Sequence, residues 1–164
     1  MALFQHSVLG HYLKLQEPSL IDDKYTAFCQ YFHDPAIQKN IRESKEEQFQ
    51  EGFLRELFVN VLGYTIRPNS DYNLTTEYRN QKGAKKADGA ILDSDQQAIG
   101  VIELKSTKTK DLEQVRQQAF DYKANQAKCK YVVTSNFEKL RFYIENAVDY
   151  LEFDLFTLRR DEFA

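Results

Sequence analysis

The fold is decided by one stretch of the sequence, KADGAILDSDQQAIGVIELK, residues 86–105. Two mainly apolar segments in it, 86–92 and 98–104, flank the polar residues 93–96, a pattern typical of a β-hairpin. The second segment is a nearly unbroken apolar run, which predicts a strand buried on both faces. Asp88 interrupts the first segment and two charged residues close the second, so these charges need an explanation of their own.

The neighbouring segments predict helices around this hairpin. Apolar residues at helical spacing predict one helix over residues 20–37, which Asp34-Pro35 should interrupt or end because the residue before proline avoids helical angles. Ser44 and Glu47 form a capping-box pattern that starts a second helix, and Gly63 is a plausible end for it. A third helix is expected over residues 111–127 and further strands over residues 130–134, 140–144 and 151–155. This order predicts an α/β fold, a mixed β-sheet flanked by helices.

Length and charge limit the class of protein. The 164 residues fit one domain, and no apolar stretch approaches the roughly 20 residues needed to cross a membrane. The first ten residues lack the pattern of a secretory signal, so a cytoplasmic location is expected. The net charge of −3 argues against a general nucleic-acid binder, although residues 79–86 and 105–110 are basic. Such basic runs are usually solvated loops.

The charged residues of the hairpin point to metal chemistry. Glu103 and Lys105 lie two apart on a strand and share a face, and a hairpin can bring Asp88 beside them. A carboxylate at the end of a core strand is costly unless it is paired or binds a metal. Two adjacent carboxylates suit Mg²⁺, which polarises a phosphate and lowers the pKa of a bound water. The lysine can orient that water or stabilise charge on the phosphate.

Spacing alone also permits a plainer interpretation. Glu103 and Lys105 would then form a surface ion pair at the end of a strand, and Asp88 would make a turn with Gly89, since exposed charges at strand ends are common.

Several motifs resemble the PD-(D/E)xK nuclease superfamily. Asp88-Gly89 followed by the Ile-Glu-Leu-Lys of residues 102–105 matches its catalytic pattern, with Ala87 in place of the first proline. The Gln-Ala-Phe-Asp-Tyr of residues 118–122 resembles the QxxxY element of some branches. The segment 53–64 resembles the first helix of the nuclease domains in type I and type IIG restriction enzymes. The resemblance covers residues 44–156.

The resemblance implies a restriction-endonuclease-like fold and a Mg²⁺-dependent DNA endonuclease of a restriction-modification system. It implies that Asp88 and Glu103 bind the metal, that the Leu104 carbonyl can be a further ligand, and that Lys105 acts on the attacking water. The whole chain, 1–164, would be a single nuclease domain, with a helical extension at 1–43 and the core at 44–156.

The resemblance also implies further site residues. A helix glutamate often joins such a site, with Glu47 as the candidate and Glu51 as the alternative; the capping-box spacing explains Glu47 equally well. Gln118 and Tyr122, one turn apart on a helix, are expected near the active site or the DNA backbone, although a half-buried helix face would also explain them.

Double-stranded DNA is the expected partner. The basic residues expected to contact its phosphates are Arg79, Lys85, Lys86 and Lys108. In type IIG enzymes such a domain is followed by a methyltransferase and a specificity domain, and these are expected in the same or a partner chain. Two alternatives remain open, a nuclease fold that has lost its chemistry and only binds DNA or a partner, and a nuclease acting on RNA.

Overall fold

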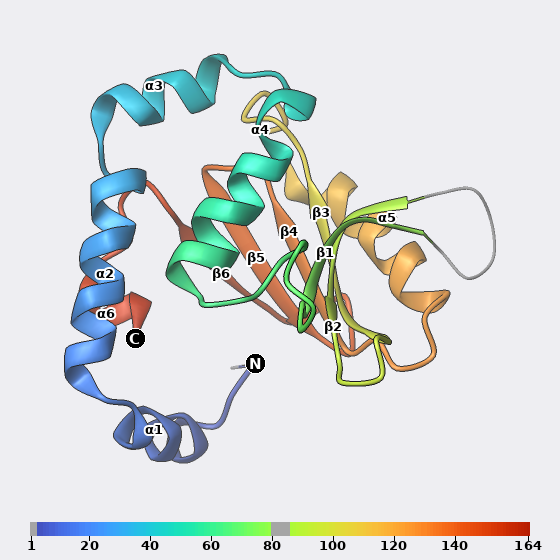
Figure 1. The fold of residues 1–164 in the computed structure, drawn as a ribbon, viewed down its shortest axis with the longest axis horizontal. Coiled ribbons are helices and arrows are strands. Elements are labelled where there is room, and N and C mark those ends of the chain that lie inside the picture. The colour runs from blue at the N-terminus through green and yellow to red at the C-terminus, as the bar shows by residue number, and fades with distance from the viewer. Residues whose placement is uncertain (1–2, 80–85) are drawn as a thin grey trace.

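A mixed β-sheet organises the chain in the computed structural model, which describes residues 3–79 and 86–164 (Figure 1). The six strands of these described residues lie in the sheet in the order in which they occur along the chain. They are β1 Leu74–Arg79, β2 Lys86–Leu92, β3 Ala98–Leu104, β4 Tyr131–Ser135, β5 Lys139–Ile144 and β6 Tyr150–Asp154. The α/β class and the mixed sheet predicted from the sequence are confirmed.

The pairing of the strands explains the position of one helix. β3 and β4 are parallel, whereas the other neighbouring pairs among the described strands are antiparallel. Parallel neighbours need a crossover connection, usually a helix. Helix α5, Leu112–Ala124, makes this crossover and packs on β3 and β4. The predicted β2–β3 hairpin and the helix after it are both confirmed.

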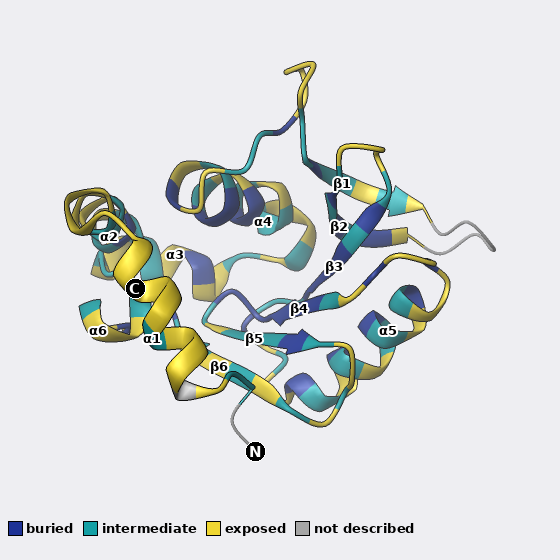
Figure 2. Cartoon of the chain, turned by 90° about the horizontal axis from the view of Figure 1, so that it is seen from below, coloured by how far each residue is buried: buried dark blue, intermediate teal, exposed yellow. Residues whose placement is uncertain are grey.

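The two faces of the sheet are covered by different helices, as the edge-on view in Figure 2 shows. On one face lie α4, Glu46–Phe53, and its continuation η1, Leu54–Val61. Their buried side chains join Ile102 and Leu104 in the main core. On the other face, Ala119 and Tyr122 of α5 pack with Val101. Because side chains alternate along a strand, Glu103 lies on the α5 face together with Val101.

The second predicted helix changes its winding halfway. From Leu54 to Val61 it is a π-helix, and the Leu62 amide donates to the Leu57 carbonyl at 2.9 Å, five residues back. Its apolar residues recur every four positions, a longer spacing than the 3.6 residues per turn of an α-helix. The wider π turn therefore keeps Phe53, Leu57 and Val61 buried together. Gly63 ends this helix with a positive φ of 81°, as predicted.

Two of the three N-terminal helices, the second and the third, also reach the core. The three helices are α1 His6–Leu15, α2 Pro18–Phe32 and α3 Pro35–Glu43. The predicted break at Asp34-Pro35 is confirmed, and the Asp34 carboxylate accepts from the Ala36 amide at 2.7 Å as the cap of α3. Phe28 and Phe32 are fully buried in the same cluster as Phe53. Among the described helices, none combines the length and the apolar character needed to span a bilayer.

Some elements differ from the sequence-based expectation. Strand β1, helix α1 and the short helix α6, Arg160–Phe163, are not predicted. The capping box at Ser44 is wrong, because Ser44 ends α3 and its hydroxyl donates to the Asn40 carbonyl at 2.8 Å. Helix α4 begins at Glu46 instead, and the Lys45 amide donates to the Gln48 side chain at 2.9 Å.

We expect Phe53→Ala to lower the free energy of unfolding by about 3–5 kcal/mol, the usual cost of removing a fully buried phenyl ring. Urea unfolding followed by circular dichroism measures this change. Val148→Ala is the control, because Val148 is 77% exposed and its truncation should change stability by less than about 0.5 kcal/mol. Equal effects of the two substitutions would contradict this packing.

Candidate active site

The two predicted metal-binding carboxylates meet where β2 and β3 pair. Gly89 pairs with Ile102, so the next step of the antiparallel register sets Asp88 opposite Glu103. One Asp88 oxygen, Oδ2, accepts from the Leu104 amide at 2.7 Å. Asp88 is therefore fixed to the end of β3, next to Glu103, by a charge-assisted hydrogen bond.

Lys105 lies at the centre of the site. Its ammonium nitrogen donates to Glu103 Oε1 at 2.8 Å, to the Leu104 carbonyl at 3.1 Å and to Glu46 Oε1 at 3.2 Å. The Lys105 side chain is 24% exposed, whereas that of Glu103 is 1% exposed. The structure thus brings together Asp88, Glu103 and Lys105 in one cluster at the strand ends.

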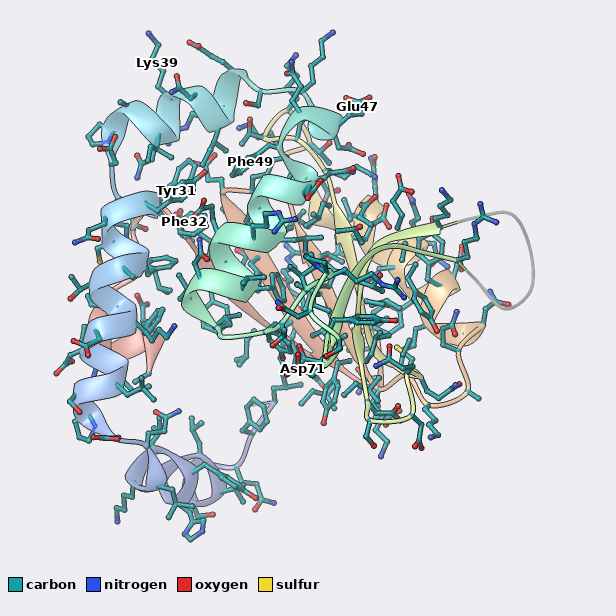
Figure 3. The ribbon with its side chains drawn as sticks, in the orientation of Figure 1. Tyr31, Phe32, Lys39, Glu47, Phe49 and Asp71 are labelled. Carbon is teal, nitrogen blue, oxygen red and sulfur yellow. The ribbon has the colours of Figure 1, made fainter. Side chains whose placement is uncertain are left out.

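The helix glutamate in this cluster is Glu46 and not Glu47. The Glu47 side chain, labelled in Figure 3 on the first turn of α4, is exposed. Glu51 is exposed as well and forms an ion pair with Arg55 at 2.9 Å. Helix α4 begins at Glu46, and the Glu46 side chain accepts from Lys105 at 3.2 Å.

Gln50 is a site residue that the sequence interpretation missed. Its amide nitrogen donates to Asp88 Oδ1 at 3.1 Å and to Glu46 Oε1 at 3.3 Å, so it bridges the strand and the helix. A signal for it exists in the sequence. Glu46, Gln50 and the buried Leu54 recur every four residues and share one helix face, whereas Glu47 lies on the neighbouring exposed face.

Helix α5 adds two side chains from the other side of Glu103. The Gln118 amide nitrogen donates to Glu103 Oε1 and, at 3.3 Å, to the hydroxyl of Tyr122. Both residues of the QxxxY element therefore join the hydrogen-bonded cluster. Glu103 Oε2, in contrast, is buried and has no hydrogen-bond partner among the described residues.

Burial and like charge shift the pKa values of the two carboxyls upward. Burial, followed by the charge of Asp88, raises the pKa of Glu103 to about 7. Burial also raises the pKa of Asp88, against the lowering effect of the Leu104 amide. For Lys105, burial alone would lower the pKa, but the hydrogen bond and the charge of Glu103 raise it. Lys105 is therefore a stable cation beside two carboxyls that resist ionisation.

These residues fit a divalent cation. The charge of Asp88 raises the pKa of Glu103, and the buried Glu103 Oε2 has no hydrogen-bond partner among the described residues. A cation would relieve both conditions, and hard oxygen ligands suit Mg²⁺. Within residues 3–79 and 86–164, no three or more His, Cys, Asp or Glu side chains form a metal-binding group. The groups at these strand ends that could hold such an ion are the carboxylates of Asp88 and Glu103 and the Leu104 carbonyl.

The basic residues expected to contact DNA lie on two sides of the cluster. Arg79 and Lys86 pair across β1 and β2, and Lys86 also forms an ion pair with Glu77 at 2.9 Å. Lys108 is exposed in the loop that follows Lys105. Lys85 lies outside the described residues.

The described strands form a mixed sheet with helices on both faces, an α/β fold, and the end of β3 carries the buried Glu103 followed by Lys105. Residues 33–164 match the family model described as MmeI, N-terminal domain, and the chain belongs to this family. The resemblance to the N-terminal domain of type IIG restriction enzymes is thereby confirmed.

Two solved structures are similar to this chain. One, described as a DrdV–DNA complex, has a TM-score of 0.50 and 17% identity over 85% of this chain. The other, the type IIG restriction endonuclease BpuSI, has a TM-score of 0.47 and 21% identity over 62% of this chain. At such identity the likeness concerns the fold alone. The chain spans 12% of the length of each of these proteins. No curated protein matches the sequence.

The raised pKa of Glu103 predicts a pH-dependent stability in metal-free buffer. A carboxyl that binds its proton more tightly in the folded state stabilises the fold below its ordinary pKa of 4.5, and this contribution is lost as the pH rises through about 7. Glu103→Gln keeps the shape and cannot ionise. The difference in melting temperature, Glu103→Gln minus the unchanged chain, should therefore grow as the pH rises from about 4.5 to about 7.

The measurement is a series of melting curves in EDTA across this pH range. Glu47→Gln is the control, and its curve should run parallel to that of the unchanged chain because the Glu47 side chain is exposed. A constant difference between Glu103→Gln and the unchanged chain at every pH would show that Glu103 ionises normally.

Proposed function

We propose that this chain is a magnesium-dependent DNA endonuclease domain of a restriction-modification enzyme, acting in the cytoplasm. The observation that carries the proposal is the cluster of Asp88, Glu103 and Lys105 at paired strand ends, in a chain of the MmeI N-terminal domain family. The likeness to BpuSI, described as a type IIG restriction endonuclease, agrees with it but concerns only part of a much longer protein.

In this proposal Asp88, Glu103 and the Leu104 carbonyl hold Mg²⁺. When bound, the ion polarises the phosphate and lowers the pKa of a water. Glu103 has to be ionised for this, so binding favours loss of the proton that burial otherwise retains. Lys105 stabilises the charge that develops on the phosphate or orients the attacking water.

The other polar residues of the cluster position these groups. Gln118 holds one oxygen of Glu103, and Tyr122 holds Gln118. Gln50 holds Asp88 from the opposite side. A site of this kind needs its ligands fixed by a surrounding set of hydrogen bonds, because a small displacement of a catalytic group is costly.

DNA is the proposed substrate, bound through phosphate contacts from Arg79, Lys86 and Lys108, together with Lys85 outside the described residues. The net charge of −3 provides little general attraction for DNA. We therefore propose that sequence recognition and much of the affinity come from a specificity domain, and that a methyltransferase accompanies it, in the same or a partner chain. Cutting by the 164 residues alone should be weak, and any binding should weaken steeply with salt.

The test of the proposal is nicking of supercoiled plasmid DNA in Mg²⁺ or EDTA, with the chain fused to a DNA-binding domain if its own activity is too low. Lys105→Ala should reduce nicking by a factor of about 100 to 1,000, because it removes the cation at the reacting phosphate. Lys130→Ala is the matched control. Lys130 is exposed and precedes β4 at the opposite end of the sheet, so nicking should be unchanged.

Asp88→Asn separates the enzyme from a DNA-binding module. This variant keeps an oxygen that can accept from the Leu104 amide and removes one ionised ligand. In an enzyme it should abolish nicking, weaken Mg²⁺ binding and raise the melting temperature in EDTA, because it removes carboxylate repulsion. In a binding module the DNA affinity of Asp88→Asn would be unchanged or higher, and neither the unchanged chain nor any variant would nick DNA. Cleavage of RNA but not of DNA would change the substrate, and full nicking by Lys105→Ala would rule out its proposed role.

A further inference from the structure

The ammonium of Lys105 occupies the oxygen set that the proposed metal requires. It lies 2.8 Å from Glu103 Oε1 and 3.1 Å from the Leu104 carbonyl, and both residues are proposed ligands. Its third contact, at 3.2 Å, is Glu46 Oε1. An ammonium has three N–H donors, so these three oxygens account for all of them. The lysine is bound here as a small cation would be.

A metal ion and the Lys105 ammonium would repel each other if both contacted Glu103 and the Leu104 carbonyl. A divalent ion on Glu103 and the Leu104 carbonyl would lie within a few ångströms of the ammonium, in a site where burial strengthens their repulsion. The ammonium must therefore move when the ion binds. The Lys105 side chain is 24% exposed, so one side of it is open to solvent.

Glu46 is the group that remains available to the displaced ammonium. It comes from α4 rather than from the strands, and its side chain is 31% exposed. Its Oε1 already accepts from Gln50 at 3.3 Å as well as from Lys105, which fixes its position. Asp88, by contrast, uses its two oxygens to accept from Gln50 and from the Leu104 amide.

We propose that the Lys105 ammonium occupies part of the metal site in the metal-free protein and leaves it when Mg²⁺ binds Glu103 and the Leu104 carbonyl. Glu46 is a positioning residue, which holds the displaced ammonium. The inference rests on the metal site of the proposed function. The lysine occupies Glu103 Oε1 and the Leu104 carbonyl in the metal-free protein, and its displacement sets part of the cost of binding Mg²⁺. Glu46 lowers that cost without being a ligand.

The test is a double-mutant cycle on Mg²⁺ affinity, with Lys105→Met, Glu46→Gln and the double variant. Affinity is measured by calorimetry with MgCl₂ and by the rise in melting temperature with MgCl₂ concentration, so it does not depend on activity. Lys105→Met should bind Mg²⁺ about tenfold more tightly or better, because charge-assisted hydrogen bonds of the competing ammonium no longer have to be broken. Lys108→Met is the control for loss of a nearby exposed positive charge.

Glu46→Gln distinguishes a positioning residue from a ligand. With Lys105 present it should weaken Mg²⁺ binding several-fold, because the displaced ammonium loses its partner. With Lys105→Met its effect should shrink to that of Glu47→Gln, which removes a neighbouring exposed charge. An equal loss in both backgrounds would make Glu46 a metal ligand and overturn the proposal.

The remaining outcomes are also decisive. Unchanged or weaker Mg²⁺ binding by Lys105→Met would show that the lysine does not compete, while the metal site of the proposed function would stand. No Mg²⁺ binding by any protein in the cycle would remove that site and this inference together. If Lys105→Met does not fold, Lys105→Gln replaces it, since glutamine keeps hydrogen-bond donors without the charge.

Discussion

The burial of the Glu103 carboxyl is the constraint on which the rest of the site depends. Its side chain is 1% exposed at the end of an apolar strand, and an isolated carboxylate there would be strongly destabilising. The protein compensates it by a cation, Lys105, and by a donor, Gln118. One oxygen, Oε2, still has no hydrogen-bond partner among the residues that the structure describes. The groups around Glu103 are thus explained first by this compensation and only then by catalysis.

The topology of the sheet supplies these compensating groups from distant parts of the chain. The antiparallel β2–β3 pairing sets Asp88 opposite Glu103, and the parallel β3–β4 pairing requires the crossover helix that carries Gln118. On the other face, α4 is held against Ile102 and Leu104 by its apolar side and directs Gln50 to the strand ends. Strand β2 and helix α5 therefore meet at Glu103, and α4 reaches the same strand ends through the hydrogen bond of Gln50 to Asp88.

The sequence predicted what depends on local pattern and missed what depends on helix phase or distant contacts. Strands β2 and β3 were predictable because their apolar runs contain charges only where chemistry or turns need them. Glu46 was missed although it shares a helix face with Gln50 and Leu54, and Glu47, one residue further on, points about 100° away from that face. Gln50 depends on Asp88, which is 38 residues away. Strand β1 is half polar and forms because β2 pairs with it.

The balance of charge at the site bears on how a phosphate would approach it. Asp88, Glu103 and Glu46 face one ammonium there, so the site is negative whenever its carboxyls are ionised. A phosphate would be repelled by such a surface, and the net charge of −3 offers no general compensation. In the proposed enzyme Asp88 and Glu103 would hold a divalent ion, whose charge would offset this repulsion, and Lys105, held by Glu46, would stabilise charge on the phosphate from its exposed side. Metal loading and substrate approach would then be coupled through one lysine, and this is the role that the proposal gives to the buried carboxyl, the lysine two residues later and the glutamate on a separate helix.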